Sequence, residues 1–421
     1  MSIDEAGSLI VTFARKLTLA AGVVALAGTG LVPGAMAQQA GPAEPMPNLP
    51  APGAGPQVTP DTATQAPTIK WSRSQASELV RALEASAAEG LDPKDYDIDG
   101  VEAALAAGEG AQLDTAASAA ALELARDHLF GAVDDKAQFY WYIERNGAEG
   151  AALPGALAEA VAGGRVGEWL QSLLPQNRHY RAMKAALADA KESAMRTRLR
   201  ANMERWRWMP RQLGSNYIYV NVPTYQLWLV EDNAIIWDTP VVVGAKKTPT
   251  PQLHVPANEI VANPSWYIPQ SIIKEEGIRP GSRKYEVKQA ADGTITARQK
   301  PGPNNSLGRI KINMANPYAI YLHDTPAKSL FSAKERALSH GCIRVAWVGR
   351  LAAHLLGQED VPALDAALTK PSETKVIPLK RQWPVWLVYF TADQDGEGKL
   401  RTLGDPYGRD AAVAKALDAV A

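Results

Sequence analysis

The sequence is short of cysteine and of net charge. A single cysteine, Cys342, occurs among 421 residues, so no disulfide can form within one chain. The 44 basic and 45 acidic residues leave a formal net charge of -1. Such a balance gives no broad electrostatic attraction to nucleic acid or to anionic lipid. Any partner must therefore be recognised through local chemistry.

The chain also lacks a long apolar run. The candidate nearest the start, Leu17–Leu31, is shorter than the roughly 20 residues that a membrane-spanning helix needs, which argues against an anchor. It follows Arg15 and Lys16 and is succeeded by the small residues Ala35–Ala37. This order predicts a secretory signal peptide over residues 1–37 and export to the periplasm. No later segment predicts a stable membrane span.

Composition divides the remainder of the chain. Residues 38–70 are rich in Pro, Ala, Gly and Gln with almost no large apolar residues, which predicts a disordered linker. Apolar residues then recur at helical spacing, which predicts an α-helical scaffold domain over residues 71–210. After Pro210 the alternation has period two, which predicts a β-rich domain over residues 211–380. We expect a C-terminal strand and helix over residues 381–421, and an α+β fold overall.

Prolines interrupt the β-rich part after its first strands. The interrupting residues are Pro251, Pro256, Pro264, Pro269 and Pro280. Because proline cannot donate to a sheet ladder, residues 268–302 predict an inserted, partly irregular lobe rather than a continuous sheet.

The most informative stretch surrounds the thiol and reads Ser339-His340-Gly341-Cys342-Ile343-Arg344. A lone cysteine in an exported protein is a buried inert thiol, an intermolecular bridge or a reactive nucleophile. Apolar spacing from Val345 onward predicts a helix that starts just after the cysteine. The N-terminus of that helix would favour the thiolate and would offer backbone N–H groups to an oxyanion. Gly341 has no Cβ and would let a substrate carbonyl approach.

A nucleophilic thiol needs a base, and two histidines compete for that role. His323 ends a predicted strand over Tyr318–His323, so a strand-loop-helix return could bring it to Cys342. His340 is closer in sequence but would point elsewhere on a tight turn. We therefore favour a dyad of Cys342 and His323, with Tyr321 on the same strand face. The second nitrogen of His323 should donate to a carbonyl, for which Ser339 is a candidate.

These residues resemble the signature of the L,D-transpeptidase catalytic domain, in which a histidine precedes Ser-x-Gly-Cys. Three further stretches are similar to the large, multidomain Gram-negative branch of that family: Tyr321–Pro326, Pro301–Gly308 and Arg205–Pro210. The resemblance covers about residues 71–421. The peptidoglycan-binding module of that branch, which normally precedes the Arg205 stretch, is missing here.

The resemblance implies a reaction on peptidoglycan. Cys342 would attack the carbonyl between diaminopimelate and the D-alanine at position four of a tetrapeptide donor. D-Alanine would leave, and an amine on a neighbouring stem peptide would resolve the thioester without any cofactor. His323 would be the base, while Ser339, His340 and Gly341 would shape the oxyanion site. Arg344 would hold the loop or a substrate carboxylate, and the 268–302 lobe would form a lid that excludes water.

Other residues carry weaker signals. The remaining histidines lack metal-ligand spacing, so we expect no metal site; they are His128, His179, His254 and His354. Most of the eleven tryptophans fit core positions, but Trp266 and Tyr267 are candidates for lining the cleft.

Three alternative functions remain open at this point. The same acyl-enzyme would make an L,D-carboxypeptidase or a cross-link hydrolase if water resolved it, and it would attach a protein to the wall if a protein lysine did. An unreactive Cys342 would instead favour a non-catalytic wall-binding scaffold.

Overall fold

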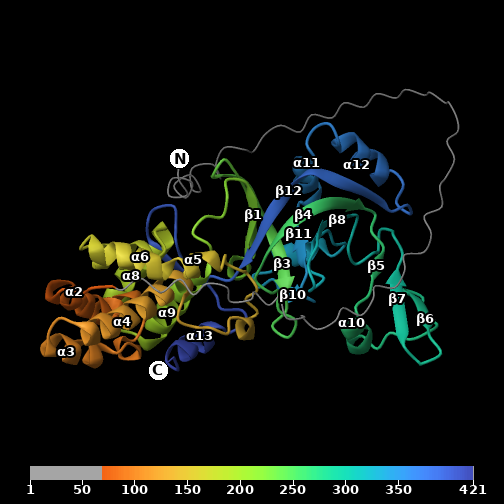
Figure 1. Ribbon diagram of the computed structural model, residues 1–421. Helices are drawn as coiled ribbons and strands as arrows, with labels where there is room; N and C mark the ends of the chain where they lie inside the picture. Colours follow the sequence, from red (N-terminus) through yellow and green to blue (C-terminus); the bar gives the residue numbers. More distant parts are fainter. Residues whose placement is uncertain (1–68, 421) are drawn as a thin grey trace, which may run out of the picture.

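A computed structural model describes residues 69–420 of the chain. The predicted signal peptide, and all but the last two residues of the predicted linker, lie outside the described residues. Helices make up the first part of the described chain, and a large mixed sheet dominates the second (Figure 1). The predicted α+β fold, a helical domain followed by a β-rich domain, is confirmed.

The first part contains eight α-helices among the described residues. They are α2 (Arg73–Glu84), α3 (Ile98–Ala107), α4 (Ala111–Phe130), α5 (Ala148–Ala151), α6 (Leu153–Ala162), α7 (Val166–Ser172), α8 (Arg178–Asp189) and α9 (Ser193–Trp208). Short 3-10 turns occur at η1 (Ala85–Glu89), η2 (Pro93–Asp95), η3 (Ala137–Phe139), η4 (Val222–Thr224) and η5 (Lys328–Ser332).

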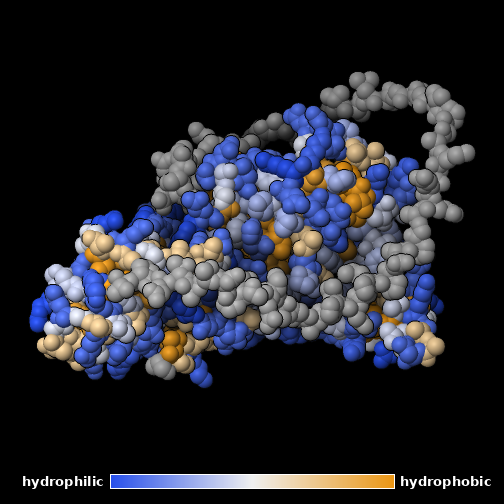
Figure 2. Space-filling model, in the orientation of Figure 1, coloured by the Kyte–Doolittle hydropathy of each residue, from blue (hydrophilic) through white to orange (hydrophobic). Residues whose placement is uncertain are grey.

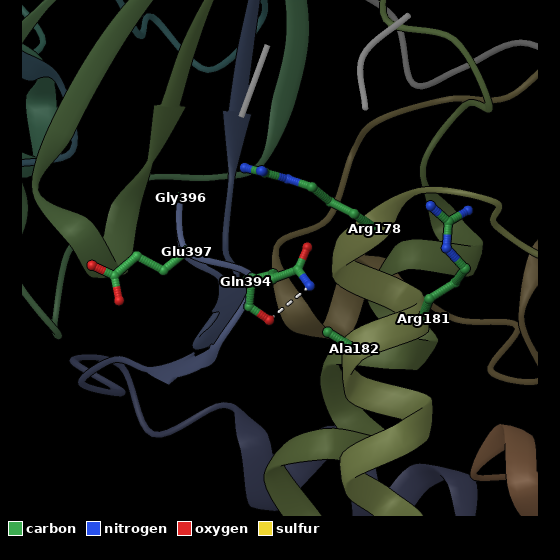
Figure 3. A pocket seen from close by; sticks show the side chains of 7 residues that line it. Arg178, Arg181, Ala182, Gln394, Gly396 and Glu397 are labelled. Carbon is green, nitrogen blue, oxygen red and sulfur yellow. Dashed lines mark hydrogen bonds between the residues drawn. The ribbon is translucent and has the colours of Figure 1, made fainter. Parts of the chain in front are cut away.

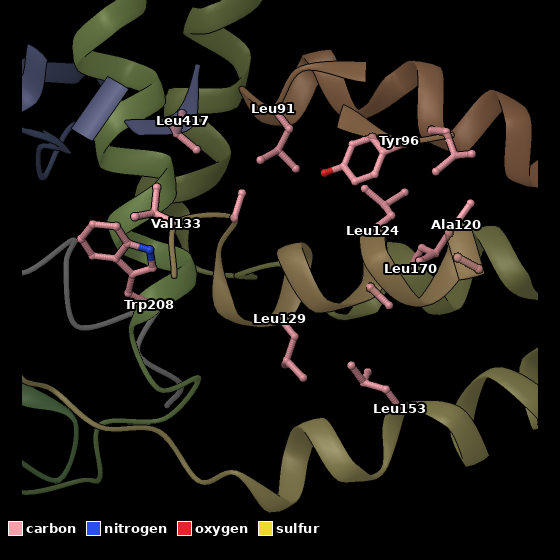
Figure 4. Packing of buried hydrophobic residues seen from close by; sticks show 14 of the residues in the cluster. Leu91, Tyr96, Ala120, Leu124, Leu129, Val133, Leu153, Leu170, Trp208 and Leu417 are labelled. Atoms are coloured by element: carbon pink, nitrogen blue, oxygen red, sulfur yellow. The ribbon is translucent and has the colours of Figure 1, made fainter. Parts of the chain in front are cut away.

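Helix α2 shows why this sequence forms helices. The side chain of Ser72 caps the helix and exchanges hydrogen bonds with Gln75 in a capping box. Its buried residues, Leu79, Val80 and Leu83 among them, fall on one face at helical spacing. That face joins the apolar cluster of the helical domain (Figure 4).

The same apolar cluster continues into the C-terminal part of the chain. Trp208 from α9 and Leu417 from α13 (Asp410–Leu417) both belong to it, as Figure 4 shows. Trp386 and Phe390, which lie in and just after the last long strand, also belong to it. The helical domain therefore shares its core with the end of the chain.

A buried ion pair lies inside α9. The guanidinium of Arg207 donates to the Glu204 carboxylate at 2.7 and 2.9 Å, and both side chains are fully buried. Glu204 also accepts from the backbone N–H of Val133 at 2.9 Å and from the indole of Trp208 at 2.8 Å. Because every donor points at one carboxylate, the pair joins α9 to the segment that follows α4.

We predict that Arg207→Met lowers the free energy of unfolding by about 3–5 kcal/mol, because the Glu204 carboxylate would keep a buried charge without its partner. Urea denaturation followed by circular dichroism measures this loss. The matched double variant Arg207→Met with Glu204→Gln should recover part of it, since the amide oxygen can still accept hydrogen bonds. Equal losses in the two variants would contradict this explanation.

The second part contains fourteen strands and three α-helices besides α13 among the described residues. The strands are β1 (Tyr217–Asn221), β2 (Gln226–Glu231), β3 (Ala234–Gly244), β4 (Leu253–Ala262), β5 (Trp266–Tyr267), β6 (Glu286–Gln289), β7 (Ile295–Gln299), β8 (Ile310–Met314), β9 (Leu322–His323), β10 (Ala337–Ser339), β11 (Ile343–Val345), β12 (Lys375–Val388), β13 (Ala392–Gln394) and β14 (Leu400–Thr402). The helices are α10 (Gln270–Glu275), α11 (Val348–Leu356) and α12 (Val361–Leu368).

Nine strands form the main sheet in the order β10-β3-β11-β9-β8-β4-β12-β1-β2. A further pairing between β2 and β3 closes this order on itself. Apolar side chains from alternate positions, such as Ile260, Ile312 and Ile343, form a second core. The strand predicted from Trp383 to Tyr389 is the second half of β12, which lies between β4 and β1.

The inserted lobe has its own sheet and core. Strands β5, β7 and β6 form a three-stranded sheet, and α10 lies beside β7 at the far end of the domain from the helices (Figure 1). Trp266, Ile273 and Leu307 belong to a separate small apolar cluster there. The segment predicted to be partly irregular is therefore a small ordered unit attached to the main sheet.

The visible surface is mainly hydrophilic, with scattered apolar areas (Figure 2). Within residues 69–420, no helix combines the length and apolarity that a membrane crossing requires.

Candidate active site around Cys342

Cys342 lies in a tight turn between two strands. Strand β10 ends at Ser339 and β11 begins at Ile343, whereas α11 begins only at Val348. The expectation that a helix starts directly after the cysteine was wrong, because the β-branched residues Ile343 and Val345 pair with β9 and β3 instead. The end of a helix dipole therefore does not act on this thiol.

Side-chain hydroxyls hold the shape of that turn. The Ser339 hydroxyl donates to the Cys342 carbonyl at 2.6 Å and accepts from the Gly341 N–H at 3.1 Å. The Thr250 hydroxyl donates to the Gly341 carbonyl at 2.6 Å and accepts from the Gly244 N–H at 2.8 Å. Gly341 has φ +119°, a conformation that strongly favours glycine. The Gly341 N–H is thus engaged within the turn.

The C-terminal segment supports Thr250 from behind. The Tyr407 hydroxyl donates to the Gly244 carbonyl at 2.7 Å and accepts from the Thr250 N–H at 3.1 Å. Tyr407 is itself buried and stacks on Tyr389. Residues far downstream of the thiol therefore fix the loop against which the Cys342 turn packs.

We predict that Thr250→Val lowers the free energy of unfolding by about 1–3 kcal/mol, because the Gly341 carbonyl and the Gly244 N–H would lose a buried partner. The rate at which Cys342 is acylated should fall with it. Urea denaturation and adduct formation followed by mass spectrometry measure the two effects. Thr239 is the matched control, since its buried hydroxyl has no hydrogen-bond partner among the described residues. If Thr239→Val lowers stability and acylation as much as Thr250→Val, the hydrogen bonds of the Thr250 hydroxyl are not the cause.

The pairing of three neighbouring strands brings the predicted residues onto one face. Arg344 on β11 pairs with His323 on β9, and His323 pairs with Lys311 on β8. One step along, the Ile343 N–H donates to the Tyr321 carbonyl at 3.1 Å, so Tyr321 lies beside Cys342. The intervening residues point into the core. Tyr321 and His323, whose ring centroids are 5.6 Å apart, therefore share the face of Cys342.

The thiol is half-buried and surrounded by donors and cations. Its sulfur donates to the Ala319 carbonyl at 3.4 Å, and Ala319 has a positive φ of 53°. Burial raises the pKa of the Cys342 thiol to about 11, although hydrogen bonds from Tyr321 and the positive charges of Lys311 and Arg344 oppose that rise. The thiol is therefore neutral at pH 7.

The imidazole of His323 is buried and oriented by a backbone carbonyl. Its Nδ1 lies 2.5 Å from the Asp324 carbonyl oxygen, which can only accept, so we assign the proton of the neutral ring to Nδ1, which leaves Nε2 as an acceptor. The backbone of Leu307 makes a further hydrogen bond to the ring. Burial, reinforced by the Arg344 charge, lowers the pKa of His323 to about 3. The prediction that His323 donates to the Ser339 carbonyl was wrong. That carbonyl accepts instead from the Ala245 N–H at 2.7 Å and from the Thr248 hydroxyl at 3.0 Å.

Asp324 is in turn held in place. Its carboxylate accepts from the Arg309 N–H at 2.8 Å and from the Lys328 ammonium. Gly308, at φ +62°, leaves room for this carboxylate, because a Cβ there would come within 2.4 Å of it. Asp324 therefore positions the histidine through its carbonyl, while its charge is used elsewhere.

A neutral thiol beside a neutral acceptor predicts a distinct pH profile for Cys342. Alkylation by iodoacetamide should rise about tenfold per pH unit from pH 6 to 9.5, because the thiolate fraction grows until pH approaches the thiol pKa of about 11. His323 should add no acidic limb above its pKa of about 3. Stopped labelling with mass spectrometry measures the profile, with N-acetylcysteine as the reference thiol. A plateau between pH 6 and 8 would indicate a preformed thiolate and imidazolium pair instead.

The remaining predicted residues take different positions. The Nε2 of His340 lies 3.7 Å from the Glu275 carboxylate of α10, so this side chain faces the lobe. Trp266 is only 8% exposed and belongs to the lobe core, while Tyr267 is 71% exposed. Burial raises the pKa of Tyr321 well above its usual value, and a hydrogen bond from Trp266 opposes that shift. Trp266 thus contacts the thiol's neighbour, and Tyr267 lies on the surface.

Arg344 has an unsatisfied donor on the active face. Its Nε is buried without a hydrogen-bond partner among the described residues. Burial lowers the pKa of its guanidinium, and Cys342, when ionised, counteracts this. Such a group is suited to meeting an anionic part of a ligand.

Sequence reasoning missed several residues of the site. Lys311 lies on the same face, and its ammonium is 4.3 Å from the centre of the Tyr321 ring. Tyr142 from the helical domain stacks on Tyr318 with a centroid distance of 4.4 Å, next to the loop that carries Ala319. The alternation of Lys311 with apolar neighbours in the sequence could have indicated which face of the strand it occupies. No sequence pattern near Tyr142 or Tyr318 indicated that the two rings stack.

The other histidines and the cavities lie apart from this face. Among the described residues no group of three or more His, Cys, Asp and Glu side chains could hold a metal ion. A cavity of about 590 Å³ lies between α8 and the β13–β14 turn, and Figure 3 shows its lining. None of its lining residues belongs to the Cys342 face.

Comparison with known families gives two matches along the chain. Residues 64–187 match a Scaffold domain, and residues 215–367 match the L,D-transpeptidase catalytic domain, YkuD. The chain therefore carries a helical Scaffold domain followed by a β-rich catalytic domain of the L,D-transpeptidase type.

A curated relative agrees with this assignment. A Haemophilus influenzae protein, provisionally named as an L,D-transpeptidase, is 30% identical over 282 residues. The alignment covers 60% of this chain and 56% of that relative, so it spans little more than half of the relative's length.

Solved structures of L,D-transpeptidases are also similar. One is from Mycobacterium smegmatis, with 14% identity, a TM-score of 0.24, and coverage of 41% of this chain and 58% of that one. Another is the catalytic domain from E. faecium acylated by ertapenem, with 14% identity, a TM-score of 0.22, and coverage of 42% and 98%. Scores this low carry no argument of their own.

Proposed function

We propose that this protein is an L,D-transpeptidase that acts on peptidoglycan stem peptides through a thioester on Cys342. The observation that carries the proposal is the shared face of Cys342, Tyr321, His323 and Arg344, which strand pairing fixes. The match of residues 215–367 to the catalytic domain family supports it. A tetrapeptide stem would be the donor, and an amine of a neighbouring stem the acceptor.

The chemistry follows from the protonation states. His323 Nε2 accepts the proton of the Cys342 thiol as the sulfur attacks the carbonyl between diaminopimelate and D-alanine. The C–N bond then breaks, and the imidazolium returns the proton to the leaving nitrogen of D-alanine. His323 ends β9, and Cys342 directly precedes the neighbouring strand β11, so the two residues are diagonal neighbours at a spacing that side chains can bridge.

The second half of the reaction repeats these steps in reverse. The acceptor amine attacks the thioester carbonyl, gives up a proton to His323, and the thiol is restored as the new amide forms. The lobe would serve as a lid that keeps water from the thioester. Its support is the contact of Trp266 with Tyr321 and the approach of His340 Nε2 to the Glu275 carboxylate at 3.7 Å.

The place of action is part of the proposal. The signal over residues 1–37 would direct the chain to the periplasm, where the wall is built and where a single unpaired cysteine avoids forming an internal disulfide. Release of the acyl group to water or to a protein lysine would use the same first step.

A carbapenem should acylate the protein, because its strained amide carbonyl can stand in for the scissile bond of the donor. We expect one covalent adduct on intact-protein mass spectrometry, on the peptide that contains Cys342. Cys342→Ala should lose the adduct while keeping its circular dichroism spectrum. His323→Gln should slow acylation by about 10²–10⁴-fold, the usual contribution of a general base.

A purified tetrapeptide donor should then release D-alanine, and mass analysis should find the cross-linked dimer. A folded protein that forms no adduct and releases no D-alanine would refute the proposal and favour a wall-binding scaffold. D-Alanine release with only tripeptide as product would identify a carboxypeptidase.

A further inference from the structure

The face that carries Cys342 also carries Lys311, a cation that has no role in the proposed reaction. Lys311 is half-buried on β8, directly across from His323. Its ammonium lies 4.3 Å from the centre of the Tyr321 ring, and Tyr321 is hydrogen-bonded to the thiol. Lys311 therefore places a positive charge beside the reacting sulfur.

This cation is incompletely neutralised. Lys311 makes no ion pair with any residue in the described range, and burial lowers the pKa of its ammonium, a shift that Cys342, when ionised, and the Glu259 carboxylate oppose. Glu259 is itself bound at 2.9 Å by the Asn313 amide. A half-buried ammonium that lacks a carboxylate partner is costly, and such groups gather at ligand sites.

A second cation, Arg344, lies on the other side of His323 from Lys311. In the strand order β11-β9-β8, His323 lies between Arg344 and Lys311, so a cation lies on either side of the base. The buried Nε of Arg344 has no partner among residues 69–420. The only carboxylate next to His323 in the chain, Asp324, is already engaged by Lys328 and Arg309. The face is therefore positive where a substrate would lie.

We propose that Lys311 is a specificity-determining residue that binds the terminal carboxylate of the donor's fourth residue. This inference rests on the proposed function. In the tetrapeptide, that carboxylate is one residue beyond the attacked carbonyl, and so belongs near the sulfur. A fifth residue would carry the carboxylate about 3.3–3.6 Å further away and would leave a neutral amide opposite the ammonium. Lys311 thereby selects tetrapeptide over pentapeptide donors.

A charge probe at the thiol tests the electrostatic part without any turnover. Iodoacetate is anionic and iodoacetamide neutral, and both alkylate Cys342. The ratio of their rates reports the local potential, and any change in thiol ionisation cancels from it. Lys311→Met should lower the iodoacetate to iodoacetamide ratio several-fold, and Lys311→Arg should keep it near the wild-type value. An unchanged ratio in Lys311→Met would overturn the inference.

Donor kinetics test the specificity itself. The donors are the tetrapeptide acid, its C-terminal amide and the pentapeptide, and the measured products are D-alanine, D-alaninamide and the released dipeptide, respectively. Lys311→Met should lower the kcat/KM ratio of acid to amide by about ten- to hundredfold, mainly through KM, as loss of one charge-assisted hydrogen bond would. Lys311→Arg should retain most of the preference.

Lys288→Met is the matched control, because this lysine is exposed on β6 in the lobe. It should change neither the alkylation ratio nor the donor preference. Equal loss on acid and amide donors in Lys311→Met would mean a structural role and would overturn the inference. A wild-type protein that releases nothing from any donor would refute the proposed function instead, a result that the alkylation ratio distinguishes.

Discussion

The pairing of β11, β9 and β8 is the constraint on which the site depends. Because side chains alternate across a strand, burying Ile343, Leu322 and Ile312 in the core forces their neighbours onto the opposite face. Those neighbours include Cys342 and His323. A slip of one residue would exchange the two sets, so the apolar core also fixes the active face.

Burial of that face shifts the pKa values of Cys342 and His323 so that the neutral form of each group is favoured. Desolvation raises the pKa of Cys342 and lowers that of His323, so both groups are neutral near pH 7. In the proposed reaction the proton would move only as a carbonyl is attacked, and charge would develop where Lys311 and Arg344 could stabilise it.

The sequence alone could predict some of this and not the rest. The change from helical to alternating periodicity indicated a helical part followed by a β-rich part, and Ser339-His340-Gly341-Cys342 marked the turn of the candidate nucleophile. The apolar spacing before Gly357 predicted a helix, but not its start, because Ile343 and Val345 satisfy a strand pattern as well as a helical one. The partner of His323 depended on where the carbonyl of Asp324 lies in space. No local signal contains that.

Long-range contacts explain why the site needs the whole described chain. Arg205 of α9 donates to Asp410 at 2.7 Å, and the Asp410 N–H donates to Asp405 at 3.0 Å. Asp405 also accepts from the Tyr389 hydroxyl, and Tyr389 accepts from the Tyr407 N–H at 2.9 Å.

From Tyr407 the contacts pass through Thr250 to the carbonyl of Gly341. A helix of the first part and the Cys342 turn are therefore joined by a chain of hydrogen-bonded polar groups, in which Nη2 of Arg205 alone is buried without a partner among the described residues. Because an unpaired member of such a network is costly, the network favours one arrangement of the two parts. The helical part thus does more than occupy space beside the catalytic domain: it helps to fix the backbone that presents the sulfur.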